Sequence, residues 1–177
     1  YLPNLINLSR SLIELDVSDT IELWLQEGLP FDHPALSLSS QNFQTRLVSA
    51  PHMSLRGQLT IPYKLIRSRP DLLHYPHFDL PLAAPGRIIA TIHDLKYIAH
   101  PDFFPQLGKI KKWLILRMTE NTCRRARLLI CDSQYTAKDL NQHLNIPFEK
   151  IVVIPLGVER RFFSPLSDSA LHDFCSR

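Results

Sequence analysis

Residues 87–94 read RIIATIHD and follow a Pro85-Gly86 break. Five apolar or β-branched residues run without interruption between Arg87 and His93. Such a run is typical of a strand buried on both faces, the pattern of a parallel sheet covered by helices. His93 and Asp94 come at the end of this strand, and the carboxyl edge of an open parallel α/β sheet is where ligands bind. We therefore interpret His93 and Asp94 as the centre of a site.

Further strands and helices alternate on both sides of this strand. Strands are expected at residues 21–25, 43–48, 71–74, 127–131 and 150–154, and helices at 3–15, 55–69, 106–126, 134–144 and 168–174. Pro62 is expected to kink or split the second helix, because proline removes a backbone donor and crowds the preceding turn. The alternation predicts an α/β fold with a Rossmann-like, doubly wound parallel sheet.

The composition is that of a globular protein. A chain of 177 residues is long enough for one domain with a sizeable core. A hydrophobic fraction of 45% and a charged fraction of 21% exclude a disordered chain. The net charge of +3 is too small to indicate nucleic acid as a partner. An odd number of cysteines without close pairing favours reduced thiols, and hence a cytoplasmic location, over a disulfide framework.

Polar residues follow the ends of several predicted strands. They are His74, His93-Asp94, Asp132-Ser133 and Gly157. Because the carboxyl ends of parallel strands share one edge of the sheet, four loops should meet at a single cleft.

Four segments from this edge resemble the N-terminal domain of GT-B glycosyltransferases, specifically the family 4 (group 1) retaining enzymes. They are DLLHYPHFDLPL, IIATIHDLKYIAHPDFFP, ARLLICDSQYTAKDL and FEKIVVIPLGVERRFFSP, which keep the family's order and spacing over about residues 69–165. The opening YLPNLINLSRSLIELD is similar to the family's first helix.

The resemblance implies about half of an enzyme. Residues 1–165 would be the acceptor-side domain, without the first strand and Gly-rich loop that the family has before its first helix. Residues 166–177 would begin the linker or helix towards a C-terminal donor domain. Residues 1–177 alone are therefore expected to be inactive.

The implied reaction moves a hexosyl group, with mannosyl as one option, from a nucleotide diphosphate sugar to an acceptor hydroxyl with retention. No metal or other cofactor is expected, and the partners would be the nucleotide-sugar donor and a glycan or lipid-linked acceptor, as in polysaccharide biosynthesis. Two alternatives stay open. A GT-B nucleotide-sugar epimerase is disfavoured by the order of motifs after IHDL, and a non-catalytic GT-B-like binding module is disfavoured by the intact His-Asp pair.

His93 and Asp94 are the expected catalytic residues, with His93 as a hydrogen-bond donor, and His74, Ser133 and Gly157 are expected to bind substrate. Each has a structural alternative. Asp94 suits a cap on the following turn, and His93 a satisfied polar group at a strand end. Ser133 stands where a helix N-cap belongs, although the N–H groups there could also hold a phosphate or a hydroxyl. Gly157 suits a turn that needs positive φ.

His74, His77 and His93 raise the alternative of a metal site. The loop that carries the first two is broken by Pro76 and lacks helical spacing, and the resemblance implies no metal. No metal site is therefore expected.

Residues 109–127, KIKKWLILRMTENTCRRAR, carry seven basic side chains and one acidic side chain. Ile110, Trp113, Leu114 and Met118 are expected to form the core face of a helix. A basic helix with further apolar residues can lie on an anionic membrane, and many members of the resembled family use lipid-linked acceptors. Peripheral contact with the inner face of the membrane is one interpretation, and an ordinary solvated helix face is the other.

Overall fold

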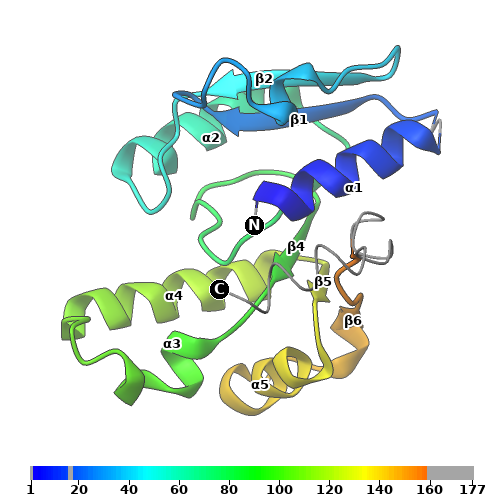
Figure 1. Cartoon of the computed structure of the whole chain (residues 1–177). Coiled ribbons are helices and arrows are strands. Elements are labelled where there is room, and N and C mark those ends of the chain that lie inside the picture. Colours follow the sequence, from blue (N-terminus) through cyan, green and yellow to red (C-terminus); the bar gives the residue numbers. More distant parts are fainter. Residues whose placement is uncertain (1, 16–17, 159–177) are drawn as a thin grey trace, which may run out of the picture.

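The computed structural model describes residues 2–15 and 18–158, and its strands form two parallel sheets with associated helices (Figure 1). The α/β, Rossmann-like class expected from the sequence is confirmed. The expected helix at 168–174 and the domain boundary at 165 lie outside the described residues.

The first unit is small and lies at the top of Figure 1. It contains α1 (Leu2–Glu14), β1 (Ile21–Gln26), the 3-10 helix η1 (Pro34–Ser37) and β2 (Phe43–Val48). β1 and β2 pair in parallel, with Ile21 opposite Phe43. Apolar side chains from these elements form their own core cluster, which comprises Ile6, Leu23, Leu25, Ala35, Leu38 and Phe43.

The second unit holds a four-stranded parallel sheet in the order β3-β4-β5-β6. Its strands are β3 (Leu73–Tyr75), β4 (Ile88–Ile92), β5 (Leu128–Cys131) and β6 (Ile151–Val153). Its helices are α2 (Leu55–Ser68), α3 (Lys96–Ala99), η2 (Pro101–Phe103), α4 (Lys109–Arg125), α5 (Gln134–Leu144) and η3 (Phe148–Lys150). In the described part of the chain, no strand joins β1 to β3, so the two sheets are separate.

β4 lies inside the larger core, as its apolar run predicts. Ile88, Ala90 and Ile92 are buried on one face, and Thr91 is buried on the other. The neighbours β3 and β5 pair with its two edges. A strand enclosed in this way is rigid, so the residues that follow it are held at a fixed place.

α2 is one continuous helix across Pro62, so the split expected there does not occur. Pro62 is buried, as is Leu65 one turn later. Packing of this face against the larger core, to which Leu65 and Ile61 belong, offsets the hydrogen bond that proline cannot make.

The expected core face of α4 is confirmed at Met118 and is wrong at Ile110, Trp113 and Leu114. Ile110 and Trp113 are 82% and 60% exposed, and Leu114 is 39% exposed. Met118 is buried together with Ile115, Thr119, Thr122 and Cys123. Their threonine hydroxyls donate to the helix's own carbonyls one turn back, those of Ile115 and Met118, so a face that contains threonines can be buried without unpaired polar groups.

This inner face of α4 also holds the loop between β3 and β4. The Thr122 hydroxyl lies 2.5 Å from the Phe78 carbonyl oxygen and accepts the Leu80 N–H at 3.2 Å. The Arg125 guanidinium donates to the carbonyl oxygens of Leu82 and Ala84. The loop that leaves β3 is therefore fixed by side chains of α4.

The packing of the loop before α2 can be tested at Gly57, near the start of this helix. A Cβ at Gly57 would lie 2.8 Å from the Pro51 carbonyl oxygen, a contact too short for real side chains. Alanine normally stabilises a helix over glycine by up to about 1 kcal/mol. We expect Gly57→Ala instead to lower the free energy of unfolding by about 1–3 kcal/mol, measured by chemical denaturation.

Gly108→Ala is the matched control, because nothing lies within 4 Å of a Cβ at Gly108. It should change the free energy of unfolding by less than about 1 kcal/mol. Equal stability of the Gly57 variant and the parent would contradict the close approach of the loop to α2.

Candidate functional site

The register of β4 and β5 brings two polar residues together at the carboxyl edge of the sheet. Ile92 pairs with Cys131, so the next residues, His93 and Asp132, leave the sheet side by side. His93 Nδ1 lies 2.5 Å from Asp132 Oδ2, and the two side chains are 12% and 17% exposed. A carboxylate has no hydrogen to donate, so Nδ1–H donates to Asp132 and the imidazole ring is held in one orientation.

The sequence places Asp132 next to Ser133 but gives it no role of its own. The sequence predicts that both His93 and Asp132 lie just after strand ends. This shared position is the signal that could have linked the two residues. The missing information was the parallel register, which decides which strand-end residues face each other.

The first turn of α5 is hydrogen-bonded to His93. Ser133 is the N-cap of α5, and its Oγ accepts the Thr136 N–H at 3.1 Å. The Thr136 hydroxyl donates to the His93 carbonyl oxygen at 3.0 Å. The capping role of Ser133 is therefore confirmed, while its role in substrate binding stays a prediction. The N-terminal end of α5 is fixed to His93, the residue that follows β4.

His74 lies inside β3, not just past its end, because this strand spans Leu73–Tyr75 and not residues 71–74. Its Nε2 is 2.8 Å from the hydroxyl oxygen of Thr91 on β4. Burial lowers the pKa of His74, and the nearby His93 lowers it further. His74 is thus a neutral, partly buried neighbour of His93.

Asp94 makes local contacts in the loop after β4. Its Oδ1 accepts the Lys96 N–H at 3.4 Å, and its Oδ2 is 3.2 Å from the Lys96 ammonium nitrogen. The carboxylate therefore caps the turn that leads into α3, the structural alternative considered for it. A catalytic role for Asp94 stays a prediction.

Gly157 is exposed and lies beyond the end of β6. The positive-φ glycines of the described residues are Gly28 and Gly86, so the conformational reason expected for Gly157 is wrong. Nothing lies within 4 Å of a Cβ at this position. A role for Gly157 in binding substrate stays a prediction.

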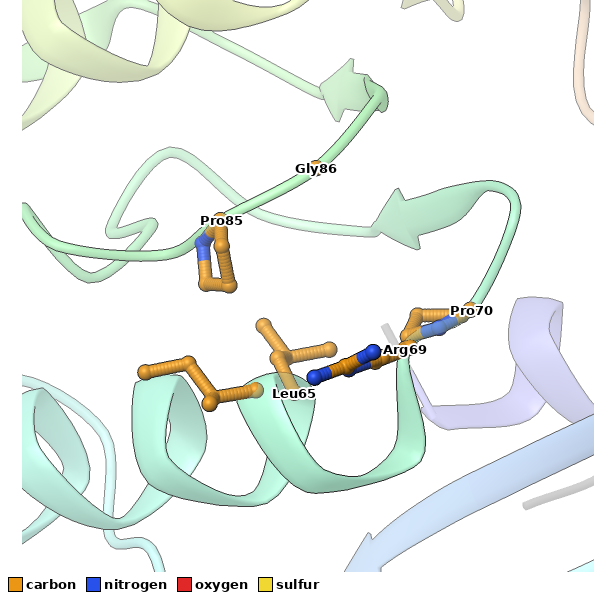
Figure 2. Close-up of a pocket in the computed structure, with 6 residues that line it drawn as sticks. Leu65, Arg69, Pro70, Pro85 and Gly86 are labelled. Carbon is orange, nitrogen blue, oxygen red and sulfur yellow. The ribbon is translucent and has the colours of Figure 1, made fainter.

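A hollow of about 300 Å³ lies at the opposite edge of the larger sheet. Figure 2 shows Leu65 of α2 and Arg69, which caps the end of this helix, on one side of the hollow. Pro85 lies on the other side. Pro70 and Gly86 precede β3 and β4, so the hollow lies at the amino ends of these strands. It is therefore separate from the edge that carries His93 and Asp132.

A second cluster of titratable side chains lies in the loops after β2 and β3. His52, His77 and Asp79 place ligand atoms within 4.8 Å of one another, and among the described residues they are the group that could hold a metal ion. His74 and His93, weighed with His77 from the sequence, are not part of it.

Cys123 and Cys131 are free and buried in the larger core. Burial raises the pKa of each thiol to about 12, so both are neutral near pH 7. Neutral buried thiols are poor nucleophiles, so neither of these two cysteines is a candidate nucleophile. In the part of the chain described here, no helix combines the length and apolar character needed to cross a bilayer.

Comparison with known proteins gives a family. A family model described as Glycosyltransferase Family 4 matches residues 31–162, more than half of the chain. The matched range contains β2 to β6 and therefore His74, His93 and Asp132. No curated protein matches the chain.

The N-cap of α5 can be tested without an activity assay. Ser133→Ala removes the acceptor for the Thr136 N–H, and we expect it to lower the free energy of unfolding by about 1 kcal/mol. Ser133→Thr keeps an acceptor oxygen and should preserve most of that stability in the same chemical denaturation experiment. If the two variants were equally stable, capping would not be the role of Ser133.

Proposed function

This chain belongs to glycosyltransferase family 4, and on that premise we propose that it is the acceptor-side domain of a retaining enzyme. The enzyme would move a hexosyl group, with mannosyl as one option, from a nucleotide diphosphate sugar to a hydroxyl of a glycan or lipid-linked acceptor. The observation that carries the proposal is the His93–Asp132 pair at the carboxyl edge of a parallel sheet, inside the matched range.

His93 would act through Nε2, because Nδ1–H is given to Asp132. In the neutral ring Nε2 is a hydrogen-bond acceptor and suits a hydroxyl of the transferred sugar. With a second proton on the ring, Nε2 becomes a donor that suits negative charge on the departing phosphate, and Asp132 offsets the charge of the ring. In both states the ring positions and stabilises the reacting groups, and it forms no covalent bond to the sugar.

The surroundings of His93 fit an anionic donor. The N-terminal end of α5 lies at this edge, since Ser133 and Thr136 of its first turn are tied to each other and to the His93 carbonyl. A helix N-terminus carries partial positive charge and suits a diphosphate. His74 is held neutral by burial, so we assign it to the shape of the site and not to its charge.

The outer face of α4 supports contact with a lipid surface. Ile110, Trp113 and Leu114 are exposed at helical spacing, and Arg117 continues the same face one turn later. Lys109 and Lys111 are exposed beside them. We propose that this outer face, residues 109–117, docks on anionic membrane, where apolar side chains enter the interface and basic ones meet the headgroups.

The proposed reaction is tested in the full-length enzyme by His93→Ala. Loss of one oriented hydrogen-bonding group should lower kcat by on the order of a hundredfold, or about 2.7 kcal/mol of barrier. Asp132→Asn should act through His93, so the double variant should be no less active than His93→Ala alone. Steady-state kinetics with a nucleotide-sugar donor measures all three variants.

The control for His93→Ala is His143→Ala, which changes an exposed histidine in the last turn of α5. It should retain full activity, and all the variants should melt within a few degrees of the parent. Unchanged activity of His93→Ala would remove this residue from the site. A large loss of stability together with activity would make His93 structural.

Membrane docking is tested by co-sedimentation with vesicles. Binding should require anionic lipid and weaken with salt, because about 1 kcal/mol per basic residue near the surface is screened over a Debye length. Trp113→Ala should reduce binding, whereas Tyr135→Ala, an exposed aromatic residue on α5, should not. Binding that ignores lipid charge, salt and Trp113 would contradict the docking face.

A further inference from the structure

Asp79 is a buried carboxylate held between two imidazoles. Its Oδ1 is 2.7 Å from His77 Nδ1, and its Oδ2 is 3.3 Å from His52 Nδ1. The side chain of Asp79 is 1% exposed, whereas that of His52 is 73% exposed. The Asp79 end of the cluster is therefore buried, and the His52 end is exposed to solvent.

The carboxylate is also oriented by a group that is not a histidine. The Met53 N–H, a backbone group, donates to Oδ2 at 3.2 Å. Such supporting bonds fix the direction of a ligand before an ion binds. Asp79 is thus preorganised, as a carboxylate ligand in a metal site must be.

The ion-pair partners of Asp79 are imidazoles, which are themselves good metal ligands. Within the described residues, the ion pairs of Asp79 are both with histidines. A bound divalent cation would be the largest positive charge beside this buried carboxylate.

We propose that His52, His77 and Asp79 form a site for one divalent transition-metal ion of the zinc type. Two imidazole nitrogens and one carboxylate oxygen suit Zn²⁺ or Co²⁺, whereas Mg²⁺ and Ca²⁺ favour all-oxygen sites. All three ligand atoms lie within 4.8 Å of one another. Tetrahedral ligands at zinc distances are separated by about 3.4 Å, so small shifts of these side chains would complete three corners and leave the fourth for water.

The ion would connect the two units of the fold. His52 follows β2 of the smaller sheet, and His77 and Asp79 follow β3 of the larger sheet. These sheets share no strand in the described part of the chain, so a shared ion would tie together two loops that backbone pairing does not. We propose this role independently of the transfer reaction, since the ligands lie in the loops after β2 and β3 and the His93–Asp132 pair follows β4 and β5.

The test is metal binding by the 177-residue chain, first freed of metal with a chelator. Isothermal titration with Zn²⁺ should give one ion per chain, and Zn²⁺ should raise the Tm by a few degrees. Co²⁺ should give the visible absorption of a low-symmetry, nitrogen- and oxygen-ligated ion. His52→Ala removes an exposed ligand without disturbing the core, and it should weaken Zn²⁺ binding by at least about tenfold.

His143→Ala again serves as the matched control, since it removes an exposed histidine outside the cluster and should leave the affinity unchanged. Asp79→Asn should abolish binding, and its far-ultraviolet circular dichroism shows whether it has folded. If it has not, His52→Ala decides alone. Two results overturn the proposal: no binding at millimolar Zn²⁺, or equal affinity of the parent, His52→Ala and His143→Ala, which would mean an adventitious ion only.

Discussion

The register between β4 and β5 is the constraint on which the site depends. Because Ile92 lies opposite Cys131, His93 and Asp132 emerge together, and their side chains meet within hydrogen-bond distance. A slip of one residue would turn the side chains of one strand to the other face of the sheet and separate the pair. The register is in turn secured by burial, since the apolar residues of both strands lie in one core.

The sequence predicts the parts of the site that follow from the positions of strands. The apolar run before His93 identifies the central strand, and the strand-end rule leads to the residues around Asp132. The hydrogen bond between them depends on register, and His52 joins Asp79 from a loop without any periodic signal. Such contacts are set by tertiary packing, which a single sequence does not display.

The error in α4 has a different physical origin. Helical spacing marks Ile110, Trp113 and Leu114 as one apolar face, but it does not say which face of a helix packs inward. The buried face instead carries Thr119 and Thr122, which look polar in the sequence and are satisfied by their own helix. One helix can therefore fix the loop after β3 with its inner face while it presents apolar and basic side chains outward.

Two cores in one chain also make its cooperativity uneven. The smaller cluster draws on α1, β1 and β2, while the larger one is built around β4 and β5, and Trp24 is a side chain of β1 that packs against the larger cluster. Regions with separate cores open separately, at free energies below that of global unfolding. Amide hydrogens of β1 and β2 should thus exchange with solvent through sub-global opening. Amide hydrogens of β4 and β5 should exchange only when the whole domain unfolds. The residues around His93 belong to the slower of these two cooperative units.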